Sequence, residues 1–130
     1  MAADQDMVEY LEDEAVGTVG TDLFASELPA GKTEGMVVTQ YPGAPPELTC
    51  GSTGITVDMP RFQFRARYAT ETTAITKVEA AATALAKVQN QTIEGTRYRS
   101  VTVLQTPGLL FRDDNNKPNW GFNFEAERDV

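Results

Sequence analysis

Strict alternation of hydrophobic and polar residues occurs in two segments of the chain and predicts a half-buried strand in each. Residues 60–69 place Phe62, Phe64, Ala66 and Tyr68 on one face and Arg61, Gln63, Arg65 and Arg67 on the other. Residues 120–128 repeat the period, with Trp120, Phe122, Phe124 and Ala126 on one face and Asn123, Glu125 and Glu127 on the other. If the two strands are neighbours in a sheet, arginines lie opposite glutamates, and each cross-strand pair contributes about 0.2–1 kcal/mol.

Two other segments carry apolar residues at helical spacing. The stripe in residues 73–89 consists of alanine and larger aliphatic side chains and predicts a helix that packs on a sheet: Ala74, Ile75, Val78, Ala81, Ala82, Leu85 and Val88. A shorter helix is predicted to end near Ala15, with Asp6 and Glu9 forming a loose capping box at its start. Gly17 is expected to close this helix in the left-handed conformation.

The rest of the chain predicts further strands, one tight turn and one domain. Residues 18–24 are expected to be extended, residues 35–41 and 97–104 are rich in β-branched side chains, and the short run 109–112 leads through a polar turn at 113–117 into the final strand. A chain of 130 residues supplies one modest core. We therefore expect residues 1–130 to form a single domain that contains the predicted helices and strands.

Residues 42–59 lack a sustained hydrophobic period and are rich in proline and glycine. They predict a long loop or extended arm, with room for a short strand at 54–57. Loops longer than about 12–15 residues in a compact domain are usually functional or disordered. This segment is therefore either an element that contacts a neighbouring molecule or an ordinary surface loop.

Charge is distributed unevenly between the two halves of the chain. The net charge is −8; residues 1–60 hold eleven Asp and Glu against the single Lys32, a balance of −10, whereas residues 61–130 hold ten Lys and Arg against eight acids, a balance of +2. A chain with a pI of about 4.4 lacks the basic patch that a nucleic-acid-binding protein needs. The asymmetry favours either head-to-tail contact between copies or an acidic surface that keeps the protein soluble.

The single cysteine, Cys50, excludes an internal disulfide and favours a reducing compartment. The first ten residues contain acids where a signal peptide has a basic region and an apolar run, and no stretch approaches the roughly 18 apolar residues of a membrane span. We expect a soluble protein that is made inside the cell and has no membrane partner.

Motifs that resemble catalytic or binding sites are incomplete. Gly31-Lys32-Thr33 lacks the earlier glycine of a phosphate-binding loop, because position 26 is serine, and Asp113-Asp114-Asn115-Asn116 lacks the calcium-loop glycine, because position 118 is proline. The chain has no histidine. The acids at 9–14 are best explained as a solvated helix face. The sequence thus predicts no enzymatic activity, no catalytic residue, no metal site and no cofactor.

Several local strings, taken in order, resemble a family of small bacteriophage proteins, the minor capsid proteins related to the tail terminator or tail completion proteins of long-tailed phages. The strings are Val8-Glu9-Tyr10-Leu11, Gly17-Thr18-Val19-Gly20-Thr21-Asp22-Leu23-Phe24, Pro45-Pro46, the strand and helix of 60–90, Thr92-Ile93-Glu94-Gly95-Thr96-Arg97-Tyr98, the turn at 107–113 and the strand at 119–127. The likeness spans nearly the whole chain and rests on structural motifs.

This resemblance implies an α+β fold, with a mainly antiparallel sheet of about four strands packed by two helices. It also implies a structural virion protein, made in the host cytoplasm, that forms a homo-oligomeric, typically hexameric ring at the head-proximal end of the tail. Its partners would be the major tail tube protein and the head-tail connector proteins of the neck, and DNA would pass through the lumen without specific binding. We expect the subunit interface to use Pro45 and Pro46 and the arginines of the positively charged half: Arg61, Arg65, Arg67, Arg97 and Arg99. Glu125 and Glu127 are the competing partners of these arginines within the subunit.

Two alternatives remain open from the sequence. One is a head-side connector, stopper or minor capsid protein of the same particle, and the other is an acidic monomeric adaptor that binds a host protein. These alternatives differ from a tail ring in oligomeric state, so the mass of the particle in solution discriminates among them.

Overall fold

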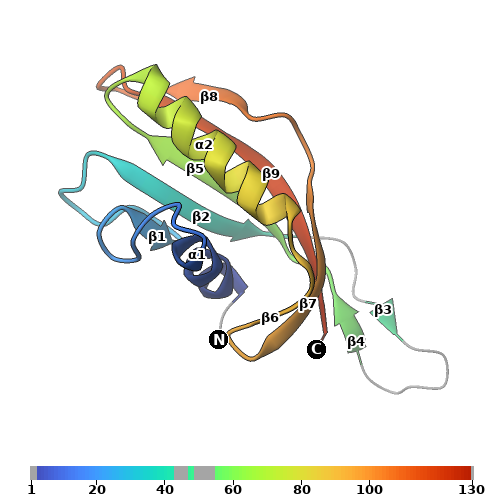
Figure 1. Cartoon of the computed structure of the whole chain (residues 1–130). Helices are drawn as coiled ribbons and strands as arrows, with labels where there is room; N and C mark the ends of the chain where they lie inside the picture. Colours follow the sequence, from blue (N-terminus) through green and yellow to red (C-terminus); the bar gives the residue numbers. More distant parts are fainter. Residues whose placement is uncertain (1–2, 43–46, 49–54, 130) are drawn as a thin grey trace.

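The computed structural model describes residues 3–42, 47–48 and 55–129 and shows an α+β fold with two helices and one curled sheet (Figure 1). The described residues form nine strands. In chain order the elements are α1 (Ala3–Asp13), β1 (Leu23–Ala25), β2 (Gly35–Tyr41), β3 (Glu47–Leu48), β4 (Ile55–Asp58), β5 (Arg61–Arg67), α2 (Glu71–Ala86), β6 (Gln89–Ile93), β7 (Thr96–Val103), β8 (Gly108–Arg112) and β9 (Pro118–Asp129).

The sheet is organised around β9, the longest strand. Along one edge β9 pairs with β5 and β4, and along the other it pairs with β7 and β8, all antiparallel. Strand β2 continues the sheet antiparallel to β5, and β1 closes that side parallel to β2. The predicted neighbour relation between the two alternating strands is therefore confirmed, in a register that places Phe62 opposite Phe124 and Phe64 opposite Phe122.

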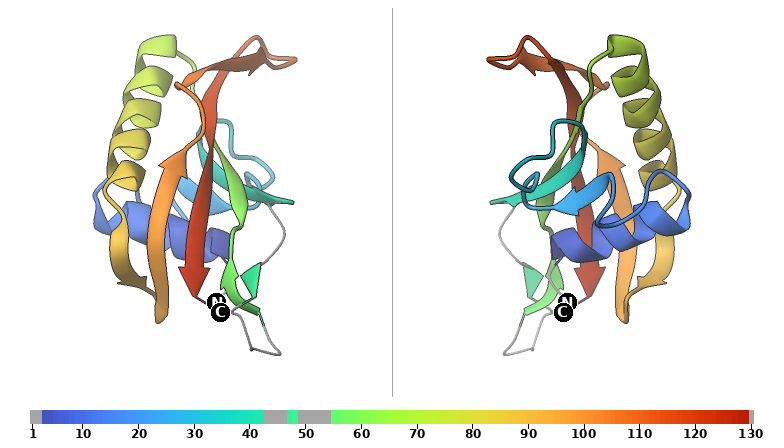
Figure 2. Two further views of the ribbon diagram at one scale, coloured as in Figure 1. Left: turned by 90° about the vertical axis from the view of Figure 1, so that its right-hand side faces the viewer. Right: turned by 90° about the vertical axis from the view of Figure 1, so that its left-hand side faces the viewer.

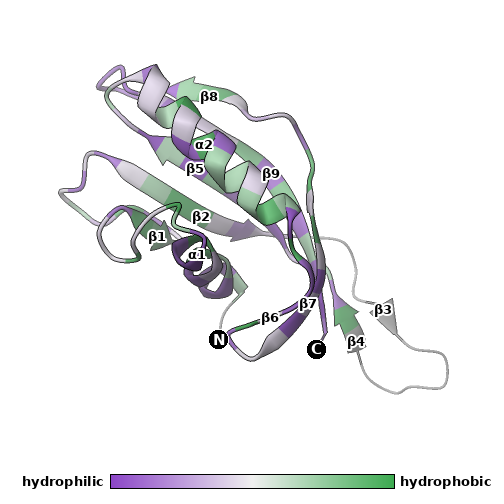
Figure 3. Cartoon of the chain, viewed as in Figure 1, coloured by the Kyte–Doolittle hydropathy of each residue, from purple (hydrophilic) through white to green (hydrophobic). Residues whose placement is uncertain are grey.

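One hydrophobic core joins both helices to the same face of the sheet. The inward side chains of β2, β5 and β9 cluster with those of α1 and α2, and the phenylalanine rings of β5 and β9 stack at 5.0 and 5.5 Å between centroids. Figure 2 shows α2 on one side of the sheet and the β8–β9 turn reaching toward the opposite side. Figure 3 shows hydrophobic segments in α2 and the strands beside it, and mostly hydrophilic residues along α1. Because the inward side chains of the sheet cluster with both helices, the helices cover one face of the sheet and the other face forms a surface.

The predicted number of strands was too low, because nine strands rather than about four make up the described sheet. The additional strands are short, and β6 carries no hydrophobic period, since Gln89-Asn90-Gln91-Thr92 lies largely exposed at an edge of the sheet. The predicted helix at 73–89 is α2, whose apolar stripe is buried as expected, but it begins at Glu71 and ends at Ala86. Val88 is buried after the helix has ended.

The start of the first helix differs from the prediction. Helix α1 begins at Ala3, so Asp6 is not a cap: its side chain is fully buried, and its Oδ2 accepts a hydrogen bond from the hydroxyl of Tyr98 at 2.7 Å. At the other end Ala15, rather than Gly17, has the positive φ of 60°. Gly17 does not have a positive φ, and a Cβ at this position would lie 2.6 Å from the methyl carbon of Met36, a flexible side chain that would have to shift.

The predicted arm at 42–59 contains two of the short strands. Strand β4 coincides with the short strand expected at 54–57 and pairs with the end of β9, and Asp58 binds Arg128 at 2.9 Å. Strand β3, which was not expected, pairs with β4. The remainder of the arm, with Pro45, Pro46 and Cys50, lies outside the described residues. Neither helix in the described part of the chain is both long and apolar enough to cross a membrane.

Candidate functional site

The face of the sheet opposite the helices carries the predicted interface arginines of β5. Because paired residues point to the same side, the outward positions follow from the register: Arg65 lies between Val37 and Gly121, and Gln63 lies between Thr39 and Asn123. We call this surface the open sheet face and define it by Thr39, Tyr41, Arg61, Gln63, Arg65, Arg67, Asn123 and Glu125. At its β1 edge, Phe24 and Val37 are buried.

The arginine row of β5 meets the glutamate row of β9 at one position. Arg61 lies opposite Glu125 and binds it at 2.7 Å between Nε and Oε2. Arg65 and Arg67 instead lie opposite Gly121 and Asn119. Arg67 binds Asp113, which belongs to the turn between β8 and β9. The expected charge match across the two strands is thus correct for Arg61 and wrong for the other two arginines.

The arginines of β7 are also paired within the subunit. Arg97 Nη1 lies 3.0 Å from Asp129 Oδ2, and Arg99 Nε lies 2.8 Å from Asp129 Oδ1. Arg99 also approaches Glu127 at 3.7 Å. These arginines and their acids are substantially exposed, so solvent screening leaves each pair with little effect on the stability of the fold.

Asp113 organises the turn beside the open sheet face. Its Oδ1 accepts hydrogen bonds from the backbone N–H groups of Asn115 and Lys117, both at 3.0 Å, while its Oδ2 binds Arg67. Burial alone would raise the pKa of this carboxyl, but the hydrogen bonds from Arg67, Lys117 and Asn119 outweigh it and lower the pKa from 3.8 to about 2. The predicted turn is therefore confirmed, and Asp113 is ionised at neutral pH.

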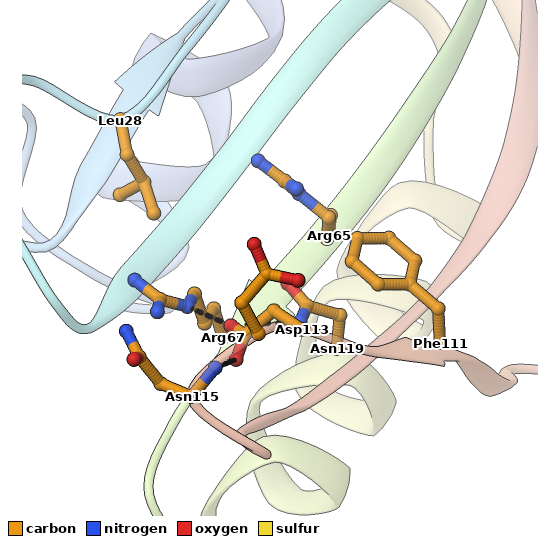
Figure 4. Close-up of a pocket in the computed structure, with 8 residues that line it drawn as sticks. Leu28, Arg65, Arg67, Phe111, Asp113, Asn115 and Asn119 are labelled. Atoms are coloured by element: carbon orange, nitrogen blue, oxygen red, sulfur yellow. Dashed lines mark hydrogen bonds and ion pairs between the residues drawn. The ribbon is translucent and has the colours of Figure 1, made fainter.

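A hollow of about 290 Å³ lies on this face, next to the same turn (Figure 4). The hollow combines two arginines with an aromatic side chain and the turn residues; it is lined by Leu28, Arg65, Arg67, Phe111, Asp113, Asp114, Asn115 and Asn119. The Arg65 guanidinium lies 6.0 Å from the ring centroid of Phe111, which is 45% exposed. Asn119 is fully buried, and its Oδ1 has no hydrogen-bond partner among the described residues.

A second hollow, of about 310 Å³, lies further along the open sheet face between Thr39, Tyr41, Gln63 and Asn123. Its side chains are polar and uncharged. Together the two hollows offer hydrogen-bond donors and acceptors, the guanidinium groups of Arg65 and Arg67 and the aromatic rings of Phe111 and Tyr41, which suit a contact with another protein surface.

The sequence did not reveal Asp113, Asp129 or Phe111 as neighbours of the arginines on this sheet. Asp129 could have been found, because it continues the period-two series of Glu125 and Glu127 on one face of β9. The link from Asp113 to Arg67 spans 46 residues and had no local signal. Across the described ranges, no group of three or more Asp, Glu, Cys or His residues is placed to hold a metal ion.

Comparison with known proteins identifies a family for this chain. No curated protein matches the chain. A family model described as bacteriophage tail terminator protein matches residues 10–130, which includes every element from the second half of α1 to the end of β9. The match covers nearly the whole chain and supports the resemblance drawn from the sequence. The chain belongs to the bacteriophage tail terminator protein family and is a structural protein of the phage tail.

Proposed function

We propose that this tail terminator assembles into a ring of identical subunits, six in number, at the head-proximal end of the tail tube. The ring contacts the major tail tube protein on one side and the head-tail connector proteins of the neck on the other. It has a structural role and no catalytic one. Family membership and the uncovered face of the sheet support this proposal.

The open sheet face is the single observation that carries the proposal. Both helices pack on the other face, so Thr39, Gln63 and Asn123 lie at a surface with two hollows. Two large apolar side chains close to this face are also exposed: Phe111 of β8, which lines one of the hollows, by 45%, and Leu104, before β8, by 41%. A polar sheet face bordered by exposed apolar side chains is typical of a surface that another protein covers.

The charge of the chain suits a ring through which DNA passes. A net charge of −8 repels phosphate groups, so DNA is expected to move through the lumen without binding. Six of the seven arginines are engaged by carboxylates of their own subunit, which further limits the positive charge available to DNA.

The oligomeric state of the purified chain tests the proposal. Size exclusion with light scattering is expected to give a particle of about 85 kDa for six copies of the 14.2 kDa chain, and negative-stain microscopy is expected to show rings. The same measurement is made with the phage's own tail tubes, because a terminator can require the tube as a template. A chain that remains monomeric alone and does not bind tail tubes would refute the proposal.

Dependence on ionic strength is a second test. Charged contacts at an interface are screened over about 8–10 Å at ordinary salt, so raising salt is expected to weaken the ring. Replacing Arg65 by Glu is expected to disperse it while circular dichroism remains unchanged, whereas Arg67 is already bound by Asp113 of its own subunit. Normal assembly of the Arg65→Glu variant at low and high salt would show that this arginine does not serve the interface.

A further inference from the structure

Arg65 differs from every other arginine of the chain. All seven arginines lie within residues 55–129, which the structure describes, and six of them bind a carboxylate: Arg61, Arg67, Arg97, Arg99, Arg112 and Arg128. Within the described residues Arg65 has no carboxylate within ion-pair distance. In a chain with 19 acidic residues, one arginine without an acid partner is an exception that needs a physical reason.

The surroundings of Arg65 make the missing partner costly. The side chain is half-buried in the hollow that Phe111 and Asn119 line. Burial lowers the pKa of the guanidinium, the neighbouring charge of Arg67 lowers this pKa further, and Asp113 opposes the shift. A charge that is partly removed from water without a partner is unfavourable. An anion supplied from outside the subunit would reverse that cost.

A complementary imbalance exists at the end of α1. Its last turn contains no basic residue, and exposed carboxylates at Asp13 and Glu14 lie next to the negative end of the helix dipole. Acids at this end destabilise a helix, whereas cations stabilise it. Helix α1 packs on β1, β2 and β6 and contributes to the core on the helix-covered face, so these carboxylates cannot reach Arg65, which is on the opposite face of the same sheet.

We propose that Arg65 of one subunit binds the Asp13–Glu14 carboxylates of the next subunit, with Phe111 packing against the incoming helix end. The proposal rests on the ring proposed above and names the contact that holds it together. Two complementary surfaces on opposite faces of one subunit make a head-to-tail contact, which closes into a ring when the rotation between copies is suitable. The positively charged half of the chain then contributes to the subunit interface through Arg65.

DNA phosphate is the main rival ligand for Arg65. The same hollow contains the carboxylates of Asp113 and Asp114, and Arg67 is already bound by Asp113. A phosphate backbone is normally held by several free cations, and here one guanidinium stands alone. A single directed ion pair with a protein carboxylate fits this arrangement better.

Charge exchange between the two surfaces tests the contact. Arg65→Gln is compared with Arg61→Gln, a matched control on the same strand whose arginine is already bound by Glu125. Loss of Arg65 is expected to raise the dissociation constant of the ring by about tenfold or more, because it leaves an interface carboxylate unpaired, and loss of Arg61 is expected to change it little. Arg65→Glu and the double variant Asp13→Lys/Glu14→Lys are each expected to prevent assembly. Lysines at the end of α1 favour the helix dipole, so the double variant keeps its fold.

Combining Arg65→Glu with Asp13→Lys and Glu14→Lys is expected to restore the ring, as measured by light scattering and microscopy. Normal assembly of Arg65→Gln would overturn this contact and leave the ring proposal intact. Disruption by Arg65→Glu without rescue in the combined variant would overturn the choice of Asp13 and Glu14. Unchanged assembly together with reduced retention of duplex DNA by Arg65→Gln would assign the guanidinium to phosphate. A wild-type chain that neither self-assembles nor binds tail tubes would instead refute the proposed function.

Discussion

Replacing Gly121 by alanine is predicted to destabilise the centre of the sheet. Gly121 of β9 lies opposite Arg65 of β5 on one side and Gly108 of β8 on the other. A Cβ at this position would lie 2.1 Å from the carbonyl oxygen of Phe64 and 3.1 Å from its carbonyl carbon. Real Cβ atoms essentially never approach other atoms closer than 3.0 Å, so β5 and β9 must move apart by about 1 Å.

The size of the effect follows from this displacement. Separating the strands lengthens two or three backbone hydrogen bonds, each of which contributes about 0.5–1.5 kcal/mol. Overpacking adds about 1–3 kcal/mol. The free energy of unfolding is therefore expected to fall by about 2–7 kcal/mol, which at an m-value of about 2 kcal/mol/M lowers the midpoint of urea unfolding by about 1–3.5 M.

Tryptophan fluorescence during urea unfolding is a direct assay, because Trp120, the single tryptophan, precedes the substituted residue. Gly108→Ala is the matched control. This glycine is the cross-strand partner of Gly121, yet its Cβ would meet no atom closer than 4.0 Å. The control is expected to unfold within about 1 kcal/mol of the wild type. Equal unfolding midpoints for the two variants would refute the steric reasoning.

Three further predictions concern the buried polar contacts, the turn and the absence of catalysis. Tyr98→Phe removes the donor to the buried Asp6 and is expected to lower the free energy of unfolding by about 1–3 kcal/mol. The double variant Asp6→Leu/Tyr98→Phe should lose less stability than the two single variants added together, and strict additivity would contradict a coupling between the two side chains. The pKa of Asp113 is lowered in the folded state from 3.8 to about 2, so its contribution to stability is present above pH 4 and is lost as the pH falls from about 4 to 2. Asp113→Asn should remove that part of the acid unfolding profile. An unchanged profile would show that Asp113 does not contribute to it. The purified chain is expected to show no metal-dependent nuclease or hydrolase activity, and an activity that disappears in Glu12→Ala or Asp113→Ala would show the opposite.

The sequence alone determined the elements whose signal is local. The strict alternation of β5 and β9 and the apolar stripe of α2 each bury one face, so their spacing reveals both the element and its inward side. The polar turn at Asp113 also has a local signal, because Asp and Asn residues favour turns. Local strings along the chain also indicated the tail terminator family, which the match over residues 10–130 bears out.

Other features were decided only by the tertiary structure, because they depend on contacts between distant residues. Strand β6 is polar and is a strand because it pairs with β7. The burial of Asp6 is compensated by a hydrogen bond from Tyr98, which lies 92 residues away in the sequence. Which acid binds which arginine depends on the strand register and on the position of the turn. The sequence therefore gives the number of charges but does not show which of them form ion pairs. The register binds Arg61 to Glu125 and the turn brings Asp113 to Arg67. Arg65 is left without an acid partner among the residues that the structure describes, because Gly121 is the residue opposite.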